Sequence, residues 1–597
     1  MIRDWRRAVR RRLAVTTAVL GAVVVGVFGL LAPPESCPTP TATELRQGAS
    51  AAVDWFARNQ FGDGRWLYLY DADSATVARD YNAVRHMGVQ LSLYQAAAAG
   101  IPGAMESADR GLAWATRQIV ERDGWAAVGD DSRIPVGATA LLVAALAERR
   151  MATGDDQYDD LLTRMGVFLV TQTEPSGAVL AYYDTAIGAP VPDEYSQYYT
   201  GEAYWALARL RLVFPDGPWP EMADRVGAYI SARRDSAEGY WPPLPDHWAG
   251  YGLAETVTVD ERAGGQPLTD DELAYARRQA GLFGVQVRWV SQQEGPWGVV
   301  ARGTHVPRGG GYGVIGEALT GLWLVSHADS RLADIRTPLG DRATCIAGLA
   351  LDAQVDAAAA DEYREPDRVQ GAWLINGETR MDDQQHALSA LLRTIPIVEA
   401  GADVTGAAQS PATWLWVVAL FAAVNPFRLA LALPRGDRTA RVATGVAGLG
   451  GIAGAAIVLL VALVASGPVL SVLGVSEPAL RIAAGVVAAI IGVGTLVVRH
   501  PSPTPALPGL GAALVPVAVP MVANAGLIML AISAYADRGA GVVAAALLIA
   551  IGVLTLAAAV VPNDGVPRRV LKWFGRLASA ALVLAAAQLV IDGLFAV

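Results

Sequence analysis

A turn made of glycine and a nearby aromatic residue recurs in this chain roughly every 60 residues, and it constrains the fold more than any other feature. Each turn follows an amphipathic segment and precedes an irregular stretch and an apolar segment with helical spacing. The six turns begin at Gly64, Gly124, Gly177, Gly239, Gly295 and Gly371. A repeat of this length that holds two helices is typical of stacked helical hairpins.

Six such pairs are expected to close into an all-α (α/α)6 toroid over residues 41–400. The first helix of a pair, such as 44–60 or 106–121, is amphipathic and is expected outside. The second is apolar on most sides and polar only where it begins, which is typical of an inner helix whose end opens on a shared mouth. The expected inner helices are 80–99, 136–149, 197–212, 247–257, 312–327 and 381–399.

The stretch Trp55-Phe-Ala-Arg-Asn-Gln-Phe-Gly-Asp-Gly-Arg-Trp66 resembles the repeats of terpene cyclase and prenyltransferase toroids. It also looks like the repeats of six-hairpin glycosidases and polysaccharide lyases, and the resemblance covers about 41–400. The Asp-x-Asp-Asp acid of squalene-type cyclases is missing. So are the zinc ligands of prenyltransferases and lanthionine cyclases. The resemblance therefore implies carbohydrate chemistry, with no metal and no cofactor.

The mean hydropathy of +0.32 over 597 residues predicts several membrane spans. An Arg-rich tail, 1–12, precedes an uncharged apolar run, 13–32, that is typical of an uncleaved signal anchor. Residues 411–597 predict six more spans, giving seven transmembrane helices in total. These six lie near 411–433, 440–466, 478–498, 507–534, 539–561 and 576–595.

Basic residues predict the topology of these spans. Arg435, Arg499 and Arg568 lie in alternate connections, whereas the connections between them carry little positive charge. The positive-inside rule then places the N-terminus in the cytoplasm of a bacterial plasma membrane, and the toroid and the C-terminus outside. The net charge of −10 argues against nucleic acid as a partner. The expected partners are the lipid bilayer and an envelope glycan.

Two of the six C-terminal spans carry helix breakers in equivalent positions. One contains Asn425-Pro426, and the other contains Pro516, Pro520 and Asn524. Paired breaks of this kind mark the midplane site of transporters. The layout resembles the MarC and LysE-type families of six-span exporters over about 411–597, which implies a substrate path along Asn425, Pro426 and Asn524. In the alternative interpretation the prolines only kink packed helices.

The polar residues at the starts of the inner helices are the candidates for chemistry. The candidate catalytic residues are Arg85, His86, Tyr198, Glu202, Asp246, His247, Asp382, Asp383 and His386. The candidate substrate-binding residues are Asp80, Asn82, Tyr199, Trp248, His305, Tyr312, Glu317 and Arg380. Four of the six histidines of the chain fall in these two groups, and this clustering is the main functional signal.

Two chemistries fit this set. Arginine, histidine and tyrosine suit a lyase or an epimerase, in which a base removes a proton beside a carbonyl carbon. A pair of carboxylates that includes Glu202, whose aromatic neighbours would raise its pKa, suits glycoside hydrolysis. In structural alternatives Arg85 and His86 bridge hairpins, Glu202 bonds between helices, and Asp382 or Asp383 caps a helix.

The two cysteines, Cys37 and Cys345, match no metal-ligand pattern. They can pair only in an oxidising compartment, and the simpler expectation is two unrelated small apolar side chains. As a whole, the sequence favours a membrane-anchored extracytoplasmic carbohydrate-active enzyme of the glycoside hydrolase, lyase or epimerase class. Its substrate would be an envelope glycan or a lipid-linked glycan. The alternatives are an exporter whose toroid binds that substrate without catalysis, and an envelope scaffold.

Overall fold

The computed structural model describes residues 36–122, 124–130, 132–262, 268–293, 311–401, 413–432, 440–473, 477–497, 517–518, 522–560 and 566–595. The chain divides into two compact units. One comprises Glu35–Ser291 and Thr304–Ala407, and the other comprises Met1–Pro34, Gln292–Gly303 and Ala408–Val597. We call the first the toroid and the second the membrane unit. His305, a candidate binding residue, lies outside the described residues.

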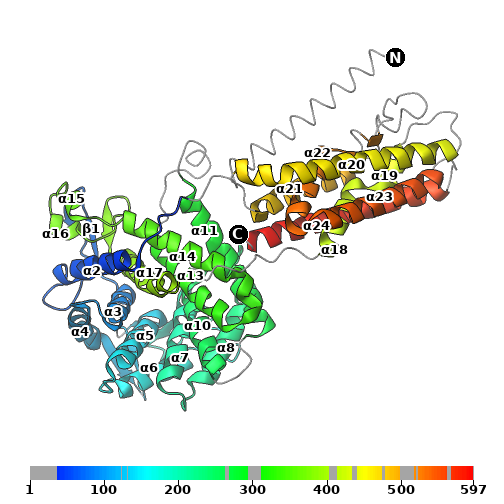
Figure 1. Cartoon of the computed structure of the whole chain (residues 1–597). Helices are drawn as coiled ribbons and strands as arrows, with labels where there is room; N and C mark the ends of the chain where they lie inside the picture. Colours follow the sequence, from blue (N-terminus) through cyan, green and yellow to red (C-terminus); the bar gives the residue numbers. More distant parts are fainter. Residues whose placement is uncertain are drawn as a thin grey trace. The chain divides into compact units, whose positions relative to one another are not determined.

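The toroid has a closed inner ring of helices (Figure 1). Each inner helix packs on the next in sequence, and the last packs on the first. The ring consists of α3 (Ala83–Ala98), α5 (Val136–Thr153), α7 (Tyr199–Val213), α10 (His247–Arg262), α13 (Tyr312–Ala328) and α17 (Met381–Glu399). The predicted toroid is therefore confirmed. Most residues of these helices are buried, as expected for helices covered on all sides.

The outer helices cover this ring and alternate with it along the chain. They are α2 (Ala42–Arg58), α4 (Ala104–Ala115), α6 (Asp159–Thr171), α8 (Trp219–Ala232), α11 (Asp270–Ser291) and α14 (Ala333–Asp352). The predicted end of the outer helix 106–121 is wrong, because the observed helix α4 ends at Ala115. The chain leaves α4 through η1 (Thr116–Gln118) into β3 (Ile119–Arg122), because the β-branched Ile119 and Val120 pair with β4 (Trp125–Val128).

The recurrent glycines have the left-handed backbone that the turns require. Gly64, Gly124, Gly177, Gly239 and Gly371 have φ between +76° and +95°. The turns at Gly64, Gly177 and Gly371 also dock closely on an outer helix. A Cβ on Gly64 would lie 2.4 Å from the carbonyl oxygen of Arg110. Glycine is needed there for both its conformation and its size. The sixth turn, at Gly295, lies outside the described residues.

Short strands in the loops fasten neighbouring hairpins. β1 (Leu69–Asp71) lies between β2 (Thr76–Val77) and β8 (Glu378–Arg380) in one sheet. Because β8 precedes the last inner helix and β1 precedes the first, this pairing joins the two ends of the ring. A second sheet has the order β5 (Arg133–Pro135), β6 (Tyr182–Asp184) and β7 (Ala189–Pro190). The shortest helices are α9 (Arg234–Ala237), η2 (Ser330–Leu332), α15 (Ala357–Ala360) and α16 (Pro366–Val369).

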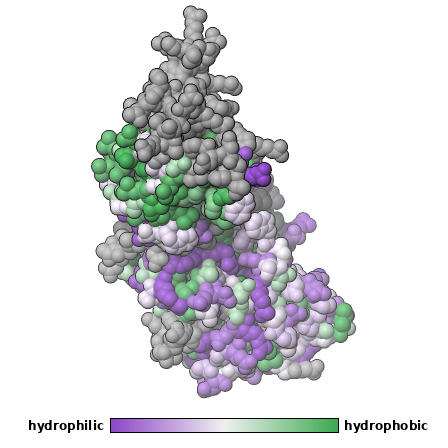
Figure 2. All heavy atoms as spheres, turned by 90° about the vertical axis from the view of Figure 1, so that its right-hand side faces the viewer, coloured by the Kyte–Doolittle hydropathy of each residue, from purple (hydrophilic) through white to green (hydrophobic). Residues whose placement is uncertain are grey.

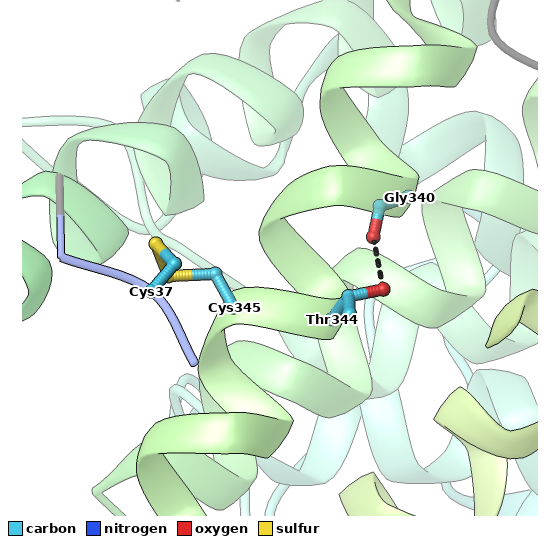
Figure 3. The surroundings of a disulfide bond; sticks show 4 residues. All are labelled: Cys37, Gly340, Thr344 and Cys345. Atoms are coloured by element: carbon cyan, nitrogen blue, oxygen red, sulfur yellow. Dashed lines mark hydrogen bonds between the residues drawn. A yellow bond between two sulfur atoms is a disulfide. The ribbon is translucent and has the colours of Figure 1, made fainter. Parts of the chain in front are cut away.

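Cys37 and Cys345 form a disulfide bond, so the expectation of two unrelated cysteines is wrong (Figure 3). Cys37 belongs to the extended segment before α2, and Cys345 belongs to α14. Gly348 leaves room for this segment, because a Cβ there would lie 2.5 Å from the carbonyl oxygen of Pro38. The bond joins residues separated by 308 positions, a distance at which sequence spacing predicts no pairing.

The membrane unit consists of apolar helices. They are α18 (Thr413–Val424), α19 (Pro426–Ala432), α20 (Ala440–Leu473), α21 (Glu477–Val497), α22 (Ala525–Arg538), α23 (Ala540–Val560) and α24 (Val566–Phe595). Four described segments are long and apolar enough to cross a membrane: Thr413–Leu431, Gly445–Val464, Ala540–Ala559 and Arg569–Val590. A shorter apolar stretch, Leu480–Leu496, lies in α21. The expected anchor, 13–32, lies outside the described residues.

Large apolar side chains cover the outside of the membrane unit. Figure 2 shows hydrophobic and hydrophilic surfaces gathered on separate parts of the molecule. The most exposed large aliphatic side chains of the membrane helices include Leu449, Ile452, Leu460, Val464, Ile490, Leu548, Leu556 and Leu584. A patch of this extent is unfavourable in water and favourable in lipid.

Candidate active site

A cavity of about 460 Å³ opens where the inner helices begin. It is lined by Asn82, Val84, Arg85, Gly88, Leu141, Tyr198, Tyr199, Glu202, Pro245, His247, Trp248, Phe283, Gln286, Gly311, Val314, Arg380, Asp382, Gln385 and His386. All six inner helices, or the residues that immediately precede them, contribute to this wall. The closed ring therefore converts six separate helix starts into one pocket of ligand-binding size.

Two histidines and one glutamate form a buried cluster at this cavity. His386 Nδ1 lies 2.6 Å from Glu317 Oε2, and His247 Nε2 lies 3.8 Å from the same oxygen. They come from α17, α10 and α13, with α13 packed between the other two helices. His247 and Glu317 are almost completely buried, and Nε2 of His247 has no hydrogen-bond partner among the described residues.

The two histidines differ in charge. Burial lowers the pKa of His247 well below its usual value, and the neighbouring His386 lowers it further. Burial also opposes the charge on His386, but the carboxylate of Glu317, together with Asp382 and Asp383, outweighs burial and raises the pKa of His386. The two imidazoles therefore differ in basicity, and His386 holds a proton more readily than His247. Environments that separate two pKa values in this way are typical of a general base and a general acid.

This cluster also has ligands of the kind that hold a metal ion. The ligand atoms of His247, Glu317 and His386 lie within 4.8 Å of one another. However, the 2.6 Å contact between His386 and Glu317 has the length of a charge-assisted hydrogen bond. A proton between these two atoms accounts for that contact.

Glu202 is a second buried acid of the cavity wall. It lies in the first turn of α7 and is 4% exposed, and its Oε2 has no hydrogen-bond partner among the described residues. Burial, together with the negative charge of Asp246, raises the pKa of Glu202 to about 8. Glu202 is therefore mainly a neutral carboxylic acid at neutral pH.

Two arginines share one carboxylate at the opposite side of the ring. Asp382 lies 3.2 Å from Nε of Arg85 and 2.8 Å from Nε of Arg380. Arg85 also donates a hydrogen bond to the hydroxyl of Tyr68. This bridge joins α3 to α17, the first and last inner helices, and leaves further N–H groups of Arg85 and Arg380 for a ligand.

Aromatic rings form part of the same wall. Trp248 stacks on Trp205, with ring centroids 5.5 Å apart and planes at 25°. Tyr198 is half exposed at the start of α7, and Tyr199 follows it. Flat apolar faces beside polar side chains are suited to sugar rings, which have both C–H faces and hydroxyl edges.

The membrane unit is broken where the sequence predicted. Asn425 separates α18 from α19 and has a left-handed backbone with φ of +44°. Its Nδ2 donates hydrogen bonds to the carbonyl oxygen of Gly575 and to Oγ of Ser579, at 2.9 Å and 3.0 Å. Asn524 caps α22, and its Oδ1 accepts a hydrogen bond from the backbone N–H of Leu527.

An ion pair that the sequence analysis did not predict lies in the same unit. Arg481 of α21 and Asp537 of α22 form two hydrogen bonds, of 3.0 Å and 2.8 Å, and both side chains are buried. These residues lie near the ends of two expected spans, where a single charge is tolerated. Arg481 and Asp537 meet only because α21 packs on α22.

Residues 413–597 match the model of the MarC family of integral membrane proteins. We refer to these residues as the MarC region. The predicted resemblance of the C-terminal part to MarC proteins is thereby confirmed, and the chain is an integral membrane protein. A search of curated proteins found no match to this chain.

The toroid is similar to solved structures of sugar enzymes. Cellobiose 2-epimerase from Spirochaeta thermophila has 15% identity and a TM-score of 0.43, and the similarity covers 60% of this chain and 98% of that chain. An inactive variant of an α-1,6-mannanase from Salegentibacter has 12% identity and a TM-score of 0.41, with coverage of 60% and 99%. Another similar structure is a D-mannose isomerase, with 12% identity, a TM-score of 0.39 and coverage of 60% and 97%.

The structure brings many of the predicted site residues to the cavity. Arg85, Tyr198, Glu202, His247, Asp382 and His386 line it, as do Asn82, Tyr199, Trp248 and Arg380. Glu317 lies behind the wall, bonded to His386. The side chain of Asn82 also caps α3, accepting a hydrogen bond from the backbone N–H of Arg85. The catalytic and binding roles of these residues stay predictions.

His86 does not reach the cavity, so its expected position at the mouth is wrong. Its Nδ1 lies 2.7 Å from the hydroxyl of Tyr81, and its ring lies between Trp66 and Trp114, with ring centroids 4.6 Å and 4.3 Å away. Burial lowers its pKa to about 3. Consecutive residues of a helix point about 100° apart, so His86 turns outward where Arg85 turns inward.

Asp246 also lies outside the cavity. Its carboxylate pairs with Arg234 and accepts a hydrogen bond of 3.0 Å from the backbone N–H of Ala249, in the first turn of α10. These contacts hold the start of α10 in place and so position His247. Arg234, the partner of Asp246, has no sequence signal, because it follows an outer helix by two residues.

Three other candidate site residues also lie outside the main cavity. Asp80 is exposed before α3. Tyr312 and Asp383 line a smaller cavity of about 50 Å³ behind the ring. Asp382 and Asp383 lie within the first turn of α17 and do not cap it, because Arg380 occupies the N-cap position. The structure also adds Phe283 and Gln286 from the outer helix α11, which the sequence analysis did not single out.

Proposed function

We propose that the toroid is a carbohydrate-active enzyme of the epimerase or lyase class that moves a proton at a carbon beside a sugar carbonyl. One observation carries this proposal. Two histidines whose pKa values are shifted in opposite directions lie at one cavity, and both approach the carboxylate of Glu317. An enzyme that removes a proton from carbon needs a base and an acid within reach of one substrate atom.

The chemistry follows from the hydrogen bonds. A neutral His247 has one ring nitrogen with a lone pair, which can accept the proton from the carbon beside the carbonyl. The electron pair of the broken C–H bond moves to the carbonyl oxygen and forms an enediolate. His386 then returns a proton to the carbon from the other side, which inverts its configuration. Glu317 holds the positive charge on His386 in place until that transfer.

The remaining wall suits a neutral or weakly charged sugar. Trp248 and Tyr199 offer ring faces, and Asn82, Gln385 and the free N–H groups of Arg85 can bond hydroxyl groups. A volume of about 460 Å³ corresponds to a small saccharide. Hydrolysis is supported less well, because Asp382, which would be the second carboxylate, is held by two arginines.

We also infer that the toroid lies on the outer side of the membrane, where its substrate is a cell-envelope glycan or a lipid-linked glycan. The disulfide between Cys37 and Cys345 supports this placement, because such bonds persist in oxidising compartments. The basic connections between the spans support it independently.

The deciding experiment uses the full chain in detergent and reducing disaccharides of glucose and mannose in D2O. Epimerisation through an enediol places deuterium from the solvent at C2, which proton NMR detects as a loss of the C2 signal. A lyase would instead form an unsaturated sugar, and a hydrolase would form new reducing ends. The last result, without exchange at C2, contradicts the proposed proton transfer.

A second candidate function rests on the MarC region. The helix breaks at Asn425 and Asn524 have the geometry expected of a transport path, so the toroid can instead bind an envelope substrate for export without catalysis. In that case Asn425→Ala and Asn524→Ala abolish the efflux of a labelled saccharide from vesicles, and sugar binding by the toroid is unchanged.

A further inference from the structure

We propose that Glu202 is the specificity-determining residue of the cavity: it donates a hydrogen bond to an oxygen of an uncharged sugar and disfavours uronates. This inference rests on the proposed function and deepens it. It names the class of sugar that the cavity selects. The selecting residue lies on α7, and α7 takes no part in the proton transfer by His247 and His386.

The first argument is an unused hydrogen-bonding group. Oε2 of Glu202 is buried and has no hydrogen-bond partner among the described residues, although Glu202 lines the cavity. A buried carboxyl group without hydrogen-bond partners costs free energy, so proteins keep such groups mainly where a ligand or water completes them. Oε2 packs against α5 and is closed to the cavity, so the oxygen that a ligand in the cavity can meet is the other one, Oε1.

The second argument is that the side chain is held in one place. A Cβ on Gly137 of α5 would lie 2.2 Å from Oε2 of Glu202 and 2.4 Å from Cδ1 of Tyr199. The carboxyl group therefore packs directly against the backbone of α5. A donor held this firmly selects ligands by the position of their oxygen atoms.

The third argument concerns the charges that face Glu202. From α10 these are Asp246, which is paired with Arg234, and the neutral His247. From α7 itself there is Tyr199, and the contact with α5 is through Gly137. Burial, with the negative charge of Asp246 added to it, raises the pKa of Glu202 and so favours its protonated form. The carboxylate of a uronate at this position would meet two acids with little solvent to screen them.

The experiment measures sugar binding to the full chain in detergent by titration calorimetry. The uncharged probes are cellobiose and α-1,6-mannotriose, and the charged probe is cellobiouronic acid. Titrations are made at about pH 6.5 and about pH 9.5, on either side of the pKa of about 8. The variants are Glu202→Gln and Glu202→Ala. Glu221→Gln, which removes an exposed acid on α8, is the matched control.

For the wild type we expect affinity for at least one uncharged probe to fall by about tenfold or more at the higher pH, because ionised Glu202 no longer donates. Glu202→Gln keeps an N–H donor and cannot ionise, so its affinity should change much less with pH than that of the wild type. Glu202→Ala should bind about tenfold more weakly at both. The wild type should bind cellobiouronic acid about tenfold more weakly than cellobiose at the lower pH.

Three results would overturn the inference. These are wild-type binding that does not change with pH, a Glu202→Gln variant that keeps the wild-type pH dependence, and no binding of either uncharged probe. The inference and the proposed function can fail separately. The expected binding pattern without deuterium exchange at C2 contradicts only the proposed reaction. Exchange at C2 with unchanged binding in Glu202→Gln contradicts only the role of Glu202.

Discussion

The imidazole rings of His247 and His386 meet edge to face, with centroids 5.1 Å apart and planes at 77°. They come from α10 and α17, two inner helices separated by α13, and α13 supplies the glutamate that both rings approach. One carboxylate therefore lies beside two histidines and forms a short hydrogen bond with only one of them. The asymmetry gives chemically identical side chains different charges.

Replacing either histidine by glutamine should lower the rate of deuterium exchange at C2 by about 100-fold or more, because the base or the acid is lost. Glutamine keeps a polar group of similar size, so circular dichroism should show a folded protein. His327→Gln, on the exposed end of α13, is the control and should leave the rate unchanged. Equal rates in His247→Gln and wild type would refute the assignment.

Glu317→Gln should move the alkaline limb of the pH–rate profile to lower pH. The charge of Glu317 raises the pKa of His386, so its removal lets His386 lose its proton earlier as the pH rises. The measurement is kcat/KM for C2 exchange across the pH range. A lower rate with an unmoved alkaline limb would show that Glu317 only supports the fold.

Glu202→Gln should make the protein less sensitive to alkaline pH. The pKa of Glu202 is about 8 in the folded chain, above its ordinary value of 4.5, so the folded state binds this proton more tightly. The resulting stability is complete at low pH and is lost as the pH rises through about 8. The variant cannot ionise. Its Tm should therefore fall less than that of the wild type between about pH 5 and about pH 9.

Asp246→Asn should destabilise the toroid, because Arg234 would lose its closer partner and keep only Glu238, whose Oε2 lies 3.4 Å from Nε of Arg234. Since one buried partner remains, we expect a loss smaller than the about 3–5 kcal/mol of a fully unpaired buried charge, measured by urea unfolding. Activity should fall by more than the unfolded fraction, because the contacts of Asp246 position His247. Removal of all three charges, with Arg234→Met, Asp246→Leu and Glu238→Gln, should recover much of the stability. Glu221→Gln, in an exposed pair with Arg225, should cost less than about 1 kcal/mol.

Cys37→Ser or Cys345→Ser should lower the free energy of unfolding by about 2–4 kcal/mol, because the bond closes a long loop of the unfolded chain. Reduction of the wild type should have the same effect. In intact cells a maleimide should label neither cysteine until a reductant is added. Labelling of both without reductant would place the toroid in a reducing compartment and contradict its proposed location.

Local patterns predicted the helices well. The inner helices that begin at Val136, His247, Tyr312 and Met381 start where the sequence indicated, because a helix pattern depends on residues three or four positions apart. The expected strand-free outer segment, 106–121, was wrong, since the pairing of β3 with β4 overrode the helical pattern. The broken spans of the MarC region were also local signals, carried by Asn425-Pro426.

The site was harder to predict, because its contacts join distant parts of the chain. Arg85 and His86 are adjacent, yet only Arg85 lines the cavity. The pairing of Cys37 with Cys345 and of Arg481 with Asp537 had no local signal either.

The sequence by itself determined that this chain has repeated helix pairs with glycine turns, followed by apolar spans, because turn conformation and hydrophobic periodicity are local properties. Only the tertiary structure decided which polar residues meet and which of them carry charge. A pKa depends on burial and on neighbouring charges, and here Glu317 approaches His386 and His247 only because the ring closes.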